Sequence, residues 1–113
     1  MSMKIATHQV DGITVLDLSG RITLGEGSVQ LRDAVRDLVS KGQKNIVLNL
    51  GDVSYMDSSG VGELVTAYTT VKNQGGELKL VNLTKKIEDL MTITKLVTVF
   101  DIHPDEASAI AAF

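Results

Sequence analysis

The sequence predicts a small α/β domain whose sheet is mixed but mainly parallel. Strand-like apolar runs alternate with segments of helical periodicity along the chain, and such alternation builds right-handed βαβ units. The first two strand-like runs are instead joined by Asp11-Gly12, a dipeptide typical of a tight antiparallel hairpin. With 113 residues, 43% of them hydrophobic and 22% charged, the chain is expected to form one globular domain over residues 1–113.

The first half of the chain predicts a hairpin, a helix and a buried strand. Residues 4–10 and 13–19 form the two arms of the hairpin. Apolar residues then recur at helical spacing at Leu31, Ala34, Val35, Leu38 and Val39. Gly42 is a natural stop for that helix, and the apolar run 46–50 predicts a buried strand.

The second half predicts three more helices and two more strands. One helix carries its apolar face on Val61, Leu64, Val65, Tyr68 and Val71. It is expected to end near Gly75-Gly76, before a strand over 77–83. Thr84 is a suitable cap for a short helix, 97–100 predicts a last strand, and Pro104 suits the first position of a final helix. The total is about four helices.

Composition excludes several classes of function. The chain has no cysteine, so it forms no disulfide and offers no thiol nucleophile. A net charge of −3, scattered basic residues and an aromatic content of 4% argue against a nucleic-acid surface. Because no apolar run reaches the length of a membrane span, we expect no direct membrane insertion. The absence of cysteine and of an apolar signal-peptide core near Met1 leads us to expect a cytoplasmic location.

Motifs for catalysis or cofactor binding are also missing from the sequence. The only histidines, His8 and His103, are not in the context of a nucleophile elbow, and no His/Cys cluster has metal-ligand spacing. Gly60-Val61-Gly62 lacks the third glycine of a dinucleotide fingerprint and the lysine of a P-loop. Asp57 follows a strand but lacks the acidic cluster that a magnesium-dependent phospho-aspartate needs. We therefore expect no enzyme activity, no metal site and no cofactor.

Two adjacent serines mark the junction between the buried strand and the second helix. Asp57, Ser58 and Ser59 are all good N-caps, and one cap is all that a helix requires. A helix start carries unpaired N–H groups and partial positive charge, which makes it a favourable place for a phosphate. Gly60 and Gly62 serve either close packing of the helix or the approach of a partner to the backbone, and the sequence does not separate the two.

The run from Ile46 to Gly62 resembles the signature of the STAS-domain anti-sigma factor antagonists, also called anti-anti-sigma factors. The resemblance covers essentially the whole chain, including Leu18-Ser19-Gly20-Arg21-Ile22 and Gly75-Gly76-Glu77-Leu78. It implies a single STAS domain and a role as a regulator of transcription.

The resemblance also implies a partner-switching cycle. The unphosphorylated protein would bind an anti-sigma factor with serine kinase activity and so free a sigma factor. Phosphorylation of Ser58, the serine directly after the motif's aspartate, would switch this binding off, and a serine phosphatase would reset it. The implied partner surface comprises Asp57, Ser58, Ser59, Gly60, Val61 and Gly62. We expect a monomer or weak dimer.

One segment departs from the family pattern. Many relatives carry Gly-x-Leu-Asp where this chain reads Gly20-Arg21-Ile22-Thr23, and by family analogy this loop lies near the phosphorylation site. The residues Gly25-Glu26-Gly27-Ser28 form either a flexible replacement loop or the start of a helix capped by Ser28.

An alternative function on the same fold is a small STAS subunit regulating a membrane lipid-transport system. Such a subunit would not need the serine, so the intact Asp57-Ser58-Ser59-Gly60 motif favours the switch.

Overall fold

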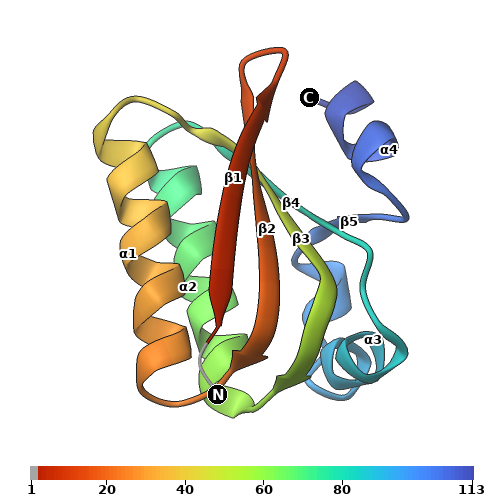
Figure 1. The fold of residues 1–113 in the computed structure, drawn as a ribbon. Helices are drawn as coiled ribbons and strands as arrows, with labels where there is room; N and C mark the ends of the chain where they lie inside the picture. The colour runs from red at the N-terminus through yellow and green to blue at the C-terminus, as the bar shows by residue number, and fades with distance from the viewer. Residues whose placement is uncertain (1–2) are drawn as a thin grey trace.

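A computed structural model describes residues 3–113 and contains one five-stranded sheet in the order β1-β2-β3-β4-β5 (Figure 1). The strands are β1 (Lys4–Val10), β2 (Ile13–Ile22), β3 (Asn45–Met56), β4 (Glu77–Val81) and β5 (Asp101–His103). The helices are α1 (Glu26–Ser40), α2 (Ser58–Asn73), α3 (Lys85–Ile93), α4 (Glu106–Ala111) and the short 3₁₀ helix η1 (Leu96–Thr98). Strand β1 pairs with β2 antiparallel and all other pairs are parallel, which confirms the predicted fold class.

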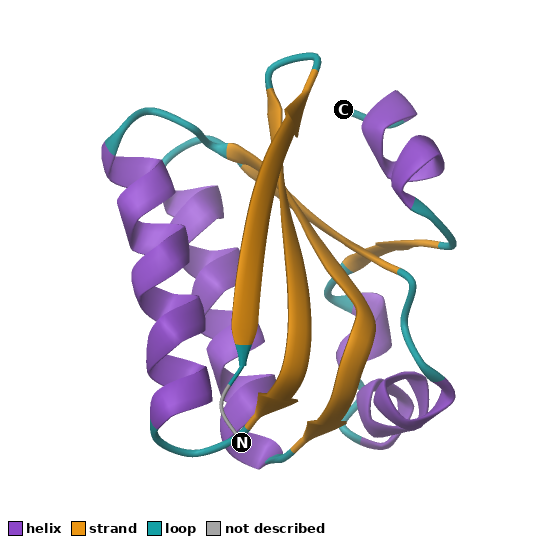
Figure 2. Ribbon diagram, viewed as in Figure 1, coloured by secondary structure: helices purple, strands orange, loops and turns teal. Residues whose placement is uncertain are grey.

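The two faces of the sheet are covered unequally (Figure 2). Helices α1, α2 and α3 pack on one face, where Leu48 and Leu50 of β3 are completely buried in the main core. The short helix α4 covers part of the other face, where Ala109 packs against Val47 in a second, smaller cluster. This alternation along β3 follows from the two-residue period of a strand that is buried on both sides.

Strands β2 and β3 are longer than predicted, and their extensions position the candidate site. Irregularities between Asp17 and Ser19 and between Gly20 and Arg21 shift the register of the two strands. The pairing nevertheless continues to Ile22 opposite Met56, so both strands end at the same edge of the sheet (Figure 1). The loops that follow β2 and β3 therefore leave this edge side by side.

The predicted hairpin is confirmed, since Asp11 and Gly12 both adopt the positive φ that its tight turn requires, at 52° and 79°. The prediction of a strand over 97–100 is wrong. The chain turns through a left-handed residue at Lys95 and forms η1 over Leu96–Thr98. The β-branched residues there lie on the surface, and tertiary packing rather than strand propensity decides the local structure.

The last strand lies just beyond the predicted one. In β5, Asp101 forms an ion pair with the buried ammonium of Lys79, its register partner in β4. The strand predicted over 77–83 ends at Val81, because Asn82 takes a positive φ of 57°. Pro104 is not the first residue of the final helix: Asp105 is the N-cap and α4 begins at Glu106.

Candidate functional site

The start of α2 is organised by Asp57. The Asp57 side chain accepts a hydrogen bond from the backbone N–H of Gly60, with Oδ1 3.0 Å from that nitrogen. Of the three cap-competent residues, Asp57 is therefore the cap, and Ser58 and Ser59 are the first two residues of the helix. Ser58 is exposed and Ser59 is partly buried, so the two serines differ in accessibility although their chemistry is the same.

Asp57 also connects two loops that are distant in sequence. Its Oδ2 accepts a hydrogen bond of 3.2 Å from the backbone N–H of Leu24, which lies in the loop between β2 and α1. The hydrogen bond from Gly60 lowers the pKa of the Asp57 carboxyl, and the bond from Leu24 lowers it further. The carboxylate is thus ionised at neutral pH and holds the two loops together.

The two glycines of α2 have different structural roles. A Cβ atom at Gly60 would lie 2.4 Å from the carbonyl oxygen of Ile22 and 2.5 Å from the Cγ of Met56. Gly60 is therefore required for the helix to approach the ends of β2 and β3. A Cβ atom at Gly62 would meet nothing within 4 Å, because this residue faces open space. The sequence left both roles open for both residues, and the structure assigns one to each.

The loop between β2 and α1 leads directly into the helix. The carbonyl of Thr23 accepts hydrogen bonds from the backbone N–H of Ser28 at 3.2 Å and from its hydroxyl at 2.9 Å. Gly25, with a φ of 97°, is the N-cap of α1, and Ser28 lies within the first turn. Of the two predicted alternatives, a flexible loop or a helix start, residues 25–28 are therefore the helix start. The prediction that Ser28 caps this helix is wrong, because the N-cap is Gly25.

A shallow hollow of about 470 Å³ lies between α1 and α2 beside this junction. It is lined by Leu24, Gly25, Ser28, Val29, Arg32, Ser59, Gly62, Glu63 and Thr66. A salt bridge joins the two helices there, with Arg32 Nε 3.1 Å from Oε1 of the buried Glu63. Leu24 is 80% exposed at the edge of this hollow.

The six residues of the implied partner surface differ in their exposure to solvent. Gly60 and Val61 are buried, Asp57 and Ser59 are partly buried, and Ser58 and Gly62 are exposed.

A cluster on the other side of the sheet was not apparent in the sequence. His8 Nδ1 lies 2.9 Å from Asp17 Oδ2, and His8 Nε2 lies 3.1 Å from Glu106 Oε2. One ligand atom from each residue lies within 4.8 Å of the others. Each ring nitrogen faces its own carboxylate, so the arrangement fits an imidazolium that bridges two acids. The hydrogen bond to Glu106 raises the pKa of His8. His8 and Glu106 lie 98 residues apart in the chain, so no spacing motif in the sequence reveals the pair.

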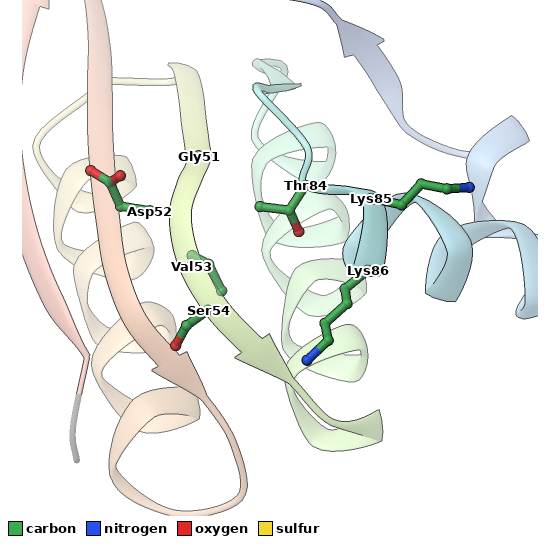
Figure 3. A pocket seen from close by; sticks show the side chains of 7 residues that line it. All are labelled: Gly51, Asp52, Val53, Ser54, Thr84, Lys85 and Lys86. Atoms are coloured by element: carbon green, nitrogen blue, oxygen red, sulfur yellow. The ribbon is translucent and has the colours of Figure 1, made fainter.

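A second hollow, of about 390 Å³, lies between β3 and the start of α3 (Figure 3). Its polar side chains do not converge: Ser54 points towards β2 and donates to the carbonyl of Gly20, and Lys85 points away (Figure 3). Lys85 pairs with Asp89 at 2.9 Å, and the Thr84 hydroxyl caps α3. These three side chains are used within the fold, whereas Lys86 extends from α3 towards β3 (Figure 3). A single ammonium group faces the hollow, which is not a phosphate cradle.

Comparison with known proteins identifies the family. The model of the STAS domain matches residues 4–109. The anti-sigma-B factor antagonist of Bacillus subtilis is 35% identical over 102 residues, which are 90% of this chain and 92% of that protein. The chain belongs to the anti-sigma factor antagonist family of STAS-domain proteins. Members of this family are non-enzymatic regulators, in agreement with the absence of catalytic motifs from the sequence.

Solved structures of other antagonists share the fold. A putative anti-sigma factor antagonist from Thermotoga maritima superposes with a TM-score of 0.89 at 25% identity, covering 96% of this chain and 92% of that one. The Bacillus cell fate determinant SpoIIAA in its phosphorylated form has a TM-score of 0.74 at 22% identity, covering 96% and 98%. Within residues 3–113, no helix is both long and apolar enough to cross a membrane.

Proposed function

We propose that this antagonist works by partner switching controlled at Ser58. The unphosphorylated protein binds an anti-sigma factor with serine kinase activity and thereby frees a sigma factor. The kinase transfers the γ-phosphoryl group of ATP to the Ser58 hydroxyl, releasing ADP and a proton, and the modified antagonist then leaves its partner. A serine phosphatase removes the phosphate by hydrolysis.

The accessibility of Ser58 is the observation that carries the proposal. Ser58 is exposed at the first position of α2, whereas Ser59 is partly buried beside the hollow. Asp57 already caps the helix, so the Ser58 hydroxyl is not required for capping. A kinase can therefore reach this hydroxyl while the start of the helix stays intact. That a solved structural neighbour, SpoIIAA, exists in a phosphorylated form supports the same chemistry on this fold.

Electrostatics explain how the modification would act on binding rather than on folding. A phosphate adds about −1.5 to −2 charges at neutral pH. The helix N-terminus favours negative charge at Ser58, so the fold tolerates it despite the neighbouring Asp57 carboxylate. A partner that covers the same surface would have to bury this charge without a counterion. A cost of about 2–5 kcal/mol would weaken micromolar binding by about thirtyfold to several thousandfold.

The same geometry supports a partner surface at the start of α2. We assign direct contact to Ser58, Gly62 and the accessible parts of Asp57 and Ser59. The buried Gly60 and Val61 contribute by holding α2 against the sheet.

The decisive experiment maps the phosphorylated residue. Each serine-kinase anti-sigma factor of the same genome is purified and incubated with this protein and ATP, and the modified residue is located by fragmentation mass spectrometry. We expect a single phosphate on Ser58, lost in Ser58→Ala and retained in the matched control Ser59→Ala.

Binding is then measured by calorimetry with the kinase that modifies the protein. Ser58→Asp should weaken association at least about thirtyfold without lowering thermal stability, while Ser58→Ala should bind but no longer be switched off. Modification mainly at Ser59, or at a threonine outside the motif, would contradict the assignment. Absence of modification by every such kinase would favour the transport-subunit alternative.

A further inference from the structure

Leu24 is the most exposed large apolar side chain among the described residues. It is 80% exposed, and it lies between β2 and α1 at the edge of the hollow. A single exposed leucine is common on protein surfaces and indicates nothing by itself. The position of Leu24 is unusual because its backbone is tied to the residue that precedes the candidate phosphorylation site.

The peptide group between Thr23 and Leu24 is hydrogen-bonded on both of its sides. The Leu24 amide donates to Asp57 Oδ2 at 3.2 Å, and the carbonyl of the preceding Thr23 accepts two hydrogen bonds from Ser28. The side chain therefore projects from an ordered backbone. An apolar group that is positioned in advance loses little conformational entropy when a partner covers it, which is the property of an interface anchor.

The surface around Leu24 extends to the first turn of α2, where Ser59 directly follows Ser58 in the chain. Val29 of α1 is 41% exposed and lines the same hollow, and Ser59 and Gly62 of α2 line it from the other helix. From Ile22 to Gly25 the loop carries no charged side chain, and the hydroxyl of the partly buried Thr23 is its polar side-chain group. The hollow beside the loop also contains the ion pair between Arg32 and Glu63. A protein whose active site receives the Ser58 hydroxyl covers about 800 Å² of this surface in a standard interface, and Leu24 falls within that area.

We propose that Leu24, with Val29 beside it, is the apolar anchor through which the serine-kinase anti-sigma factor recognises this antagonist. The inference rests on the proposed function, since it takes that kinase as the occupant of the surface. The partner must then present an aliphatic patch or pocket next to its catalytic site. Leu24 would supply affinity at a distance from the reacting atoms, and Ser58 would supply the switch.

The test compares Leu24→Ala with a matched control. Ile93 on α3 is 76% exposed and does not line the hollow, so Ile93→Ala removes a similar apolar area elsewhere. Calorimetry with the unphosphorylated proteins and the kinase that modifies Ser58 should show an affinity loss of at least about tenfold for Leu24→Ala and less than about twofold for Ile93→Ala. Leu24→Gln, which keeps the side-chain length, should bind as weakly as Leu24→Ala.

Phosphorylation kinetics give a second readout. For Leu24→Ala the KM of the kinase for this antagonist should rise while kcat stays the same, because the lost contact stabilises bound substrate and transition state equally. Circular dichroism should show unchanged folding.

The possible failures are distinguishable. If Leu24→Ala and Leu24→Gln bind like the wild type while Ser58→Asp loses binding, the anchor is overturned and the proposed function stands. Equal losses in Leu24→Ala and Ile93→Ala would also overturn the anchor. If no kinase modifies Ser58 and Ser58→Asp has no effect, the proposed function and the anchor fall together.

Discussion

Helices α2 and α4 begin with the same capping geometry but have different surroundings. Asp57 Oδ1 accepts from the backbone N–H of Gly60 at 3.0 Å, and Asp105 Oδ1 accepts from that of Ser108 at 2.8 Å. Both carboxyls have pKa values below the usual range, in each case chiefly because of the backbone hydrogen bond. The cap alone therefore does not distinguish a functional helix start from a structural one.

The difference lies in what each cap is connected to. Asp57 also binds the Leu24 amide, which lies 33 residues earlier in the chain, and the first turn of α2 packs tightly on the sheet through Gly60. The first turn of α4 is fastened instead by a side-chain ion pair between His8 and Glu106. At α2 the hydrogen bond of Asp57 joins two loops, whereas at α4 the side chain of Glu106 is joined to His8 on strand β1. The convergence of loops, rather than capping, makes the candidate site.

The largest effect should come from the tight packing under α2. Gly60→Ala places a methyl group against the carbonyl of Ile22 and the side chain of Met56. We expect the free energy of unfolding to fall by about 3 kcal/mol. Gly62→Ala meets open space and replaces a poor helix former, so it should raise stability by up to about 1 kcal/mol. Urea denaturation measures both, and equal effects at the two glycines would refute the distinction between them.

The next effect concerns the two caps. Asp57→Ala removes two hydrogen bonds and Asp105→Ala removes one, so we expect the loss of stability at Asp57 to be about twice that at Asp105. The loop gives a sharper readout. Amide hydrogen exchange at Leu24, followed by NMR, should accelerate in Asp57→Ala and stay unchanged in Asp105→Ala. An unchanged Leu24 amide in Asp57→Ala would mean that the two loops are not linked in solution.

Acid should weaken both caps. The folded-state pKa of Asp57 lies below the usual 3.8, so its stabilising effect is complete above that value and is lost as pH falls through the folded pKa. Asp57→Asn cannot ionise, so the stability gap between wild type and Asp57→Asn should be constant above about pH 5 and should shrink below about pH 3.8. Urea midpoints across this range test the sign. A gap that widens in acid would contradict it.

The smallest effect on stability is expected from the ion pair between His8 and Glu106 of α4, because the His8 side chain is exposed to solvent. The pKa of His8 is raised above the usual 6.5, first by Glu106. Its contribution to stability is therefore full below pH 6.5 and is lost as pH rises through the folded pKa. The protection factors of the α4 amides, which correct for the pH dependence of intrinsic exchange, should fall across this range in the wild type. The dependence should disappear in His8→Gln and diminish in Glu106→Gln, and persistence in His8→Gln would rule out the imidazolium bridge.

The sequence by itself determined the elements whose causes are local. The Asp11-Gly12 turn, the buried run within β3 and the place of Asp57 before a helix depend on residues within a few positions of one another. Turn geometry, side-chain periodicity and capping act over that range. The family resemblance carried by the motif around Ser58 was recognisable for the same reason, because the motif is contiguous.

Only the tertiary structure decided which groups meet across the chain. The Asp57–Leu24 bond requires β2 and β3 to end opposite each other, and the irregular register that places Ile22 beside Met56 leaves no pattern in either strand alone. The same contact gives Gly60 a packing role and leaves Gly62 open. Near the C-terminus, the left-handed turn at Lys95 overrode the strand propensity of 97–100. Local preferences amount to fractions of a kcal/mol per residue, so long-range packing prevails wherever the two conflict.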